Sequence, residues 1–116
     1  MIRESTTAVI ARNDRWSGAI ATEPYEAGWA TEALVFVRAL AFEGVAAGSE
    51  PPPAELRVQV SADGMRWIDE GTRLPLPRST EQDTFARVVR FGNWLRIAGE
   101  LPAGVAIKAL VTLHLK

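Results

Sequence analysis

Residues 105–116 read VAIKALVTLHLK, and this stretch alternates between two kinds of side chain. Because an extended strand turns successive side chains to opposite sides, an alternation of period two predicts a strand rather than a helix. One side of this strand is wholly apolar and the other is mixed, which is typical of a strand with one buried face. The apolar side carries Val105, Ile107, Ala109, Val111, Leu113 and Leu115.

The same alternation recurs at residues 55–64, ELRVQVSADG, and ends at Asp63-Gly64, a strong turn signal. The apolar side of this segment carries Leu56, Val58 and Val60, and the polar side carries Arg57, Gln59 and Ser61. A short return strand, MRWIDEG, is predicted at 65–71. An edge strand, TTAVIAR, is predicted at 6–12, and a weaker strand at 16–23.

Two longer segments complete the pattern. Residues 85–101, FARVVRFGNWLRIAGEL, predict two strands joined at Gly92-Asn93, since Gly and Asn tolerate the positive φ of a tight two-residue turn. Residues 31–44, TEALVFVRALAFEG, form the longest predicted strand, although their alanines also permit a helix. This segment is apolar on both faces, so we expect it to be central in a sheet or covered by a partner.

Seven to eight short strands separated by turns predict an all-β fold, an antiparallel β-sandwich, and specifically a partly closed jelly roll. The 116 residues suit a single β-sandwich domain spanning 1–116. If consecutive strands from Thr31 onward run antiparallel, the loops at 51–53, 74–83 and 101–104 fall at one end. The turns at 63–64 and 92–93 then fall at the other end.

Composition narrows the function classes. The formal charge is −1, so electrostatics gives no reason to expect nucleic acid or an anionic membrane as a partner. The chain has no cysteine and hence no disulfide or thiolate metal site. Residues 1–15 lack the apolar region of a signal peptide, and no apolar run is long enough to span a bilayer. We therefore expect a cytoplasmic or assembly-associated protein.

Two stretches together resemble the discoidin or galactose-binding-like β-sandwich. The first is Ser61-x-Asp63-Gly64-x-x-Trp67, and the second is Trp94-Leu95-Arg96-Ile97. The resemblance covers roughly the last 60 residues, and this chain lacks the cysteine pair that secreted members often carry. It implies a jelly roll that binds glycans, lipids or proteins, without implying a particular ligand.

No catalytic or metal signature is present, so we expect no enzyme activity, no cofactor and no metal. His114 is the only histidine, whereas a zinc site needs three or four ligands from Cys, His and carboxylates. No Gly-x-Ser-x-Gly elbow accompanies it. Asp69 and Glu70 are neighbours on a strand, so they point to opposite faces and do not form a glycosidase pair. No spaced Asp-x-Asp loop supports calcium, and no glycine pattern supports a phosphate loop.

The hairpin predicted at 85–101 supplies the candidate site. A two-residue turn would place Phe91 opposite Trp94, with arginines on the same face, and Trp67 would extend this surface. Three interpretations remain open: a cross-strand pair covered by the same chain, a subunit interface, and a platform that stacks on a sugar. The ligand or interface candidates are Trp67, Arg87, Phe91, Trp94 and Arg96.

Residues 33–42, ALVFVRALAF, favour oligomerisation. Leucines and phenylalanines alternate there with alanines and valines, so both faces are apolar, and the alanine and valine face is predicted to be the outer one. An uncovered apolar face is a liability in a monomer. The leading prediction is a non-catalytic structural or interaction protein that forms a homo-oligomer, as in a shell or virion. The alternative is a carbohydrate-binding module. A third possibility, an enzyme on a cupin-like barrel, lacks the histidines such sites use.

Overall fold

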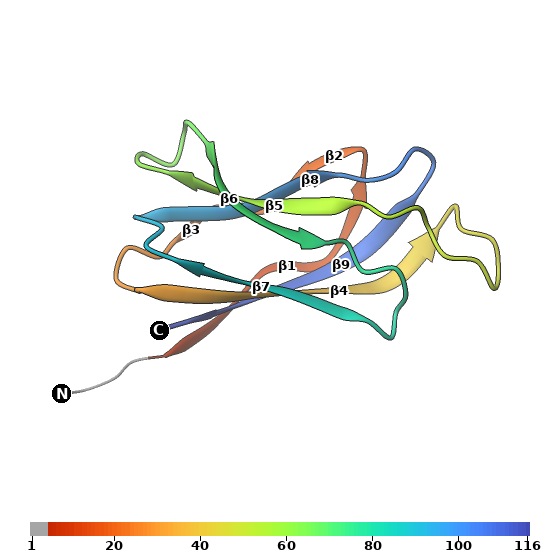
Figure 1. The fold of residues 1–116 in the computed structure, drawn as a ribbon, viewed down its shortest axis with the longest axis horizontal. Helices are drawn as coiled ribbons and strands as arrows, with labels where there is room; N and C mark the ends of the chain where they lie inside the picture. The colour runs from red at the N-terminus through yellow and green to blue at the C-terminus, as the bar shows by residue number, and fades with distance from the viewer. Residues whose placement is uncertain (1–4) are drawn as a thin grey trace.

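The structure is a computed structural model that describes residues 5–116. This part of the chain forms nine β-strands and no α-helix (Figure 1). Accordingly, none of these residues belongs to a helix long and apolar enough to cross a membrane. The strands are β1 (Thr6–Ser17), β2 (Ala19–Ala21), β3 (Tyr25–Glu26), β4 (Glu32–Glu43), β5 (Glu55–Ser61), β6 (Ile68–Pro75), β7 (Asp83–Val89), β8 (Trp94–Glu100) and β9 (Ala106–Leu115).

The strands pair as one long antiparallel ribbon wound on itself. The first half of the chain runs against the second half, with β1 on β9, β2 on β8, β4 on β7 and β5 on β6. Two further antiparallel pairings, β4 with β9 and β5 with β8, close the ribbon into two sheets. Sheet A has the order β1-β9-β4-β7, and sheet B has the order β2-β8-β5-β6, with β3 also on β8.

This winding is that of a jelly roll, in which two sheets pack face to face. Figure 1 shows the two layers, with β5, β6 and β8 above β4, β7 and β9. The predicted all-β antiparallel sandwich is confirmed. The strand count exceeds the predicted seven to eight because Tyr25–Glu26 adds a two-residue strand beside β8. The predicted domain spans residues 1–116, of which residues 1–4 lie outside the described part.

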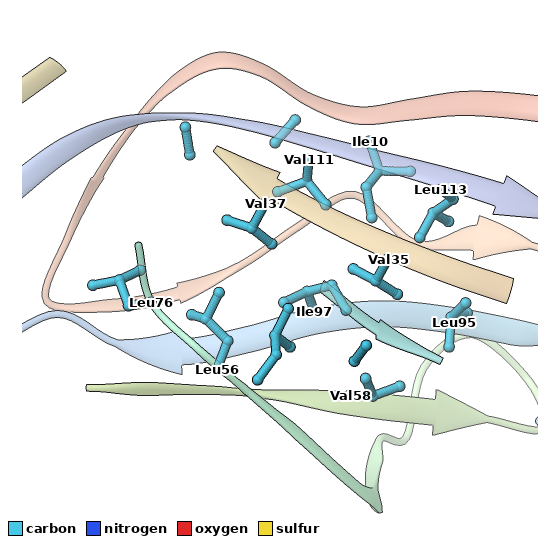
Figure 2. Packing of buried hydrophobic residues seen from close by; sticks show 14 of the residues in the cluster. Ile10, Val35, Val37, Leu56, Val58, Leu76, Leu95, Ile97, Val111 and Leu113 are labelled. Carbon is cyan, nitrogen blue, oxygen red and sulfur yellow. The ribbon is translucent and has the colours of Figure 1, made fainter. Parts of the chain in front are cut away.

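One buried cluster fills the space between the sheets (Figure 2). From sheet A it receives the apolar side of β9, and every residue predicted for that side is buried. From sheet B it receives larger side chains, such as Leu56 of β5 and Leu95 and Ile97 of β8. The period-two pattern therefore identified which residues of β9 share a face, and in this strand the wholly apolar face is the buried one.

The two faces of β4 are reversed from the prediction. From Ala33 to Ala39, the alanine and valine side, predicted to be the outer one, is buried, with Ala33, Val35, Val37 and Ala39 all 0% exposed. Leu34, Phe36 and Leu40 are at least partly exposed on the other side, but after an irregularity between Ala39 and Ala41 the faces exchange, so that Ala41 is exposed and Phe42 packs against the core. Large leucine and isoleucine side chains of sheet B fill most of the gap between the sheets, so small residues are accommodated opposite them. Alternation specifies which residues share a face but not which face is inside.

The prediction of a hairpin around Gly92-Asn93 is wrong. β7 belongs to sheet A and β8 to sheet B, so residues 90–93 cross from one sheet to the other. Arg90 (φ +56°) and Gly92 (φ +78°) both have left-handed backbone conformations, which turn the chain across the edge of the sandwich. The crossing is held by a hydrogen bond of 2.6 Å from the Ala27 amide to the Asn93 carbonyl.

The predicted grouping of the loops is confirmed. At one end, Arg78 Nε donates to the Pro51 carbonyl at 3.1 Å and so joins the loops at 51–53 and 76–82. At the other end, the turn after β5 and the crossing at 90–93 line one open depression of about 390 Å³. The turns at 63–64 and 92–93 are therefore neighbours, as the antiparallel series required.

Candidate functional site

Three of the five predicted site residues come together on the outer face of sheet B. Trp94 and Arg96 point outward from β8, and Trp67 lies just before β6. The guanidinium carbon of Arg96 lies 4.4 Å from the centre of the Trp67 ring, within range of a cation–π contact. Arg96 Nε also donates to Gln59 Oε1 at 2.8 Å, so the guanidinium is fixed from two sides.

A polar network extends from Arg96 across three strands. Gln59 of β5 is directly opposite Arg96 in the register, and its Nε2 donates to Asp69 Oδ1 at 3.0 Å. Arg57 Nε lies 3.3 Å from the same carboxylate oxygen. The pKa of Arg96 is lowered, first by partial burial of its guanidinium and second by the positive charge of Arg57. The network is thus a preorganised set of donors with a single carboxylate at its centre.

The turn between β5 and β6 supports this surface from one side. Asp63 Oδ1 accepts from the amides of Met65 at 2.8 Å and Arg66 at 3.0 Å, and from Ser61 Oγ at 3.0 Å. These bonds lower the pKa of Asp63, the Arg66 amide contributing most, followed by Met65 and Ser61. The Trp94 ring covers Gly64, since a Cβ there would lie 3.1 Å from Trp94 Cε2. The Ser-x-Asp-Gly-x-x-Trp stretch is thus a self-capped turn.

The other two predicted site residues lie elsewhere. Phe91 is 5% exposed and belongs to the core, because the crossing between sheets inserts its ring between them. Arg87 points outward from β7 on sheet A, opposite Leu34 of β4. The predicted pairing of Phe91 with Trp94 therefore does not occur. Sequence reasoning missed Gln59, Asp69 and Arg57 as members of the site, although the polar side of residues 55–61 had separated Arg57 and Gln59 from the core.

The outer face of sheet A has the opposite character. Phe36 is 39% exposed, Leu40 43%, Phe85 61% and Val89 49%. Phe36 of β4 and Phe85 of β7 are directly paired, with ring centres 6.2 Å apart and planes inclined by 27°. We call these four residues the sheet A apolar surface. Leu34 and Leu110 on the same face are partly exposed.

An exposed ion pair lies within this surface, since Arg38 stands between Phe36 and Leu40 on β4. Arg38 Nε and Nη2 donate to Asp83 Oδ1 and Oδ2 at 2.7 and 2.9 Å, the two-pronged geometry that arginine forms with carboxylates. The bond raises the pKa of Arg38 and lowers the pKa of Asp83. The pair lines a shallow depression of about 280 Å³ together with Phe36, Val37, Leu110 and Thr112. The sheet A apolar surface therefore carries both signs of charge beside its apolar rings.

His114 lies on the same outer face of β9, with its Nδ1 3.5 Å from Thr7 Oγ1. Within residues 5–116, no three or more His, Cys, Asp or Glu side chains gather in a way that could hold a metal ion.

Comparisons with known proteins relate this chain to others through structure. No protein-family model matches it, and no curated protein sequence matches it. The PBSX exported protein XepA superposes with a TM-score of 0.66 at 9% identity, over 95% of this chain. The SPBc2 prophage-derived protein YomS superposes with a TM-score of 0.57 at 8% identity, over 99% of this chain and 96% of its own. This chain spans 36% of XepA.

A family 29 carbohydrate-binding module complexed with cellulohexaose superposes with a TM-score of 0.34 at 14% identity, too low for an argument about fold or function. The identities to XepA and YomS are also too low to transfer a function. What these two structures establish is that the chain shares a β-sandwich fold with both of them.

Proposed function

We propose that this chain is a non-catalytic interaction protein that self-associates through the outer face of sheet A. The observation that carries the proposal is the sheet A apolar surface, in which Phe36, Leu40, Phe85 and Val89 all point to solvent from two neighbouring strands. The structurally similar YomS is described as a prophage-derived protein, which supports a role in a phage assembly.

The size of the surface supports a contact with another protein. The exposed fractions of Phe36 and Phe85, 39% and 61%, add up to one whole side chain, which is on the order of 200 Å². Leu40 and Val89 add exposed area on the same face, separated from the two rings by Arg38 and Arg87. The total apolar area is a few hundred Å², the size of a patch that is often functional on a monomer. A standard interface buries roughly 800 Å² per partner, so polar residues around the surface must form its rim.

The charges within this surface suit a second copy of the same chain. In a two-fold contact each patch meets itself, so the patch must be complementary to itself. Arg38 and Asp83 lie side by side on the face, and a two-fold axis would allow each to meet the opposite charge on the other copy. A partner of one charge sign would gain less from this arrangement.

The oligomeric mass in solution tests the proposal. We expect sedimentation velocity to show a mass above that of the 12.6 kDa monomer, and the fraction of oligomer to rise with concentration. A monomer at millimolar concentration would exclude self-association.

A second candidate function, glycan binding, is favoured by the arrangement of Trp67, Arg96 and Gln59 on sheet B. An indole with hydrogen-bonding groups beside it can pack against a sugar ring while the polar groups bind its hydroxyls. Screening the protein against a glycan array tests this candidate. Binding that survives Phe85→Ala but is lost in Trp67→Ala would assign it to sheet B. Absence of any glycan response would exclude it.

A further inference from the structure

The only histidine of the chain lies on the face that the proposed self-association covers. His114 alternates with the buried Leu113 and Leu115 on β9, so it points outward from sheet A, where it is partly exposed. It is directly opposite Leu34 of β4 in the register, and Phe36 is its diagonal neighbour, roughly 7–8 Å away. A titratable side chain therefore stands directly beside apolar residues of this face.

Exposed apolar side chains flank the strand of His114 on both sides. Phe36 and Phe85 lie on β4 and β7, and Val9, which is 38% exposed, lies on β1 at the other side of β9. Together with Thr112 of β9 they form one row across all four strands of sheet A. A contact that covers this row passes over β9 within two residues of His114.

The size of a stable contact also places His114 inside it. Four strands spaced about 4.8 Å apart, each covered over a length such as 32–40, give a face of about 20 by 30 Å. That is about 600 Å² of flat area, whereas a standard interface buries roughly 800 Å² per partner. A contact of standard size therefore needs the whole outer face of sheet A, including the row that holds Leu34 and His114.

The charged side chains around His114 do not favour a positive ring. Among residues 5–116, those closest to it in the register of this face are Glu32 of β4, Lys116 after β9 and Arg87 of β7. Glu32 and Lys116 are directly opposite each other, joined by backbone hydrogen bonds of 3.0 and 3.1 Å, so the carboxylate already faces a cation. On the β1 side, His114 is opposite Thr7, whose Oγ1 lies 3.5 Å from its Nδ1.

We propose that the self-association through sheet A is pH-dependent and is weakened when His114 is protonated. This inference rests on the proposed function and specifies its regulation. Histidine is the side chain that changes charge between about pH 5 and 8. Apolar side chains of a second copy can cover a neutral imidazole, whereas a covered imidazolium loses its hydration, and Asp83 is already bound by Arg38. In a two-fold contact both copies present the ring, so the penalty applies twice.

Sedimentation velocity of the intact chain at pH 7.5 and pH 5.5, at one ionic strength, tests the inference. Circular dichroism at both pH values checks that the sheets persist. An ordinary histidine is about 10% protonated at the first pH and about 90% at the second. If both rings must be neutral in the complex, the dissociation constant can rise up to about hundredfold, and we expect a rise of at least tenfold at pH 5.5.

Two variants assign the effect to the ring. His114→Gln stays neutral and should associate at both pH values as the parent protein does at pH 7.5. His114→Lys stays charged and should associate at least tenfold more weakly than His114→Gln at pH 7.5, a comparison that does not depend on how acid affects the fold.

Three results would overturn the inference while leaving self-association intact. They are equal or tighter association of the parent protein at pH 5.5, a His114→Gln variant that keeps the pH response, and equal association of the two variants at pH 7.5. Absence of association at either pH would end both proposals.

Discussion

Replacing Phe85 with alanine should weaken self-association far more than it weakens the fold. Phe85 is 61% exposed, so about 120 Å² of a side chain of about 200 Å² is open to water. Burying that area is worth about 3 kcal/mol per copy at ~25 cal/mol per Å², or about 6 kcal/mol in a symmetric dimer. Ordering and imperfect packing offset part of this gain, so we expect about half of it to be measured. A loss of about 3 kcal/mol corresponds to a roughly hundredfold rise in the dissociation constant.

The assay is sedimentation velocity over a concentration series, with Ile68→Ala as the matched control. Ile68 is 66% exposed, similar to Phe85, but it begins β6 at the edge of sheet B. The part of Phe85 that is already buried contributes about 2 kcal/mol to the monomer, so thermal unfolding should still show a folded Phe85→Ala protein. If both variants weakened association equally, or if Phe85→Ala left the dissociation constant unchanged, the assignment of the interface to sheet A would be refuted.

Three further predictions concern the fold. Gly64→Ala should lower the unfolding free energy more than Gly92→Ala does in urea titrations. Both glycines have φ of +78°, but only at Gly64 would a Cβ press on the Trp94 ring. Equal losses of unfolding free energy would contradict the packing described for Trp94. The folded pKa of Asp63 lies below its unfolded value, so the ionised carboxylate stabilises the fold at neutral pH, and this stabilisation is lost as the pH falls below about 4. The urea midpoint of Asp63→Asn should therefore drop less between pH 7 and pH 3 than the midpoint of the parent protein. An identical drop in both proteins would contradict this role of Asp63. Thr84 Oγ1 is buried without a hydrogen-bond partner among residues 5–116. Thr84→Val should therefore raise the melting temperature, because it removes the cost of about 1 kcal/mol for desolvating an unpaired hydroxyl. A lower melting temperature would indicate that the hydroxyl has a partner.

Much of the fold could be predicted because each strand has a recognisable pattern in its own short stretch of sequence. The apolar side of residues 105–115 and the length of the strand at 32–43 follow from alternation alone, and glycine-rich turns mark the ends. The hairpin at Gly92-Asn93 could not be distinguished from a crossing between sheets in this way. Both use positive φ at similar residues, and the difference lies in whether β7 or β5 pairs with β8, which is a long-range choice.

The candidate site could be predicted only in part, for a related reason. The sequence predicts a site at Trp67, Trp94 and Arg96 because large aromatic residues flank its turns. Their meeting with Gln59 and Asp69 depends on the register among β8, β5 and β6, which includes a bulge between Arg57 and Gln59. No local pattern encodes that register. The predicted hairpin places Phe91 beside Trp94 on the outer side of the strands, whereas the crossing between the sheets makes Phe91 a core residue.

The two outer faces of the sandwich are most simply explained if each has a separate task. Both sheets cover the same core, so stability alone requires only that their inner faces be apolar. On β4 the small residues Ala33, Val35, Val37 and Ala39 are buried, while Phe36 and Leu40 on the same strand are substantially exposed. Because burying large side chains contributes more than burying alanine, this distribution sacrifices hydrophobic stabilisation in the isolated chain. The self-association proposed above would recover that stabilisation by covering this face, and it would leave the polar outer face of sheet B exposed to solvent.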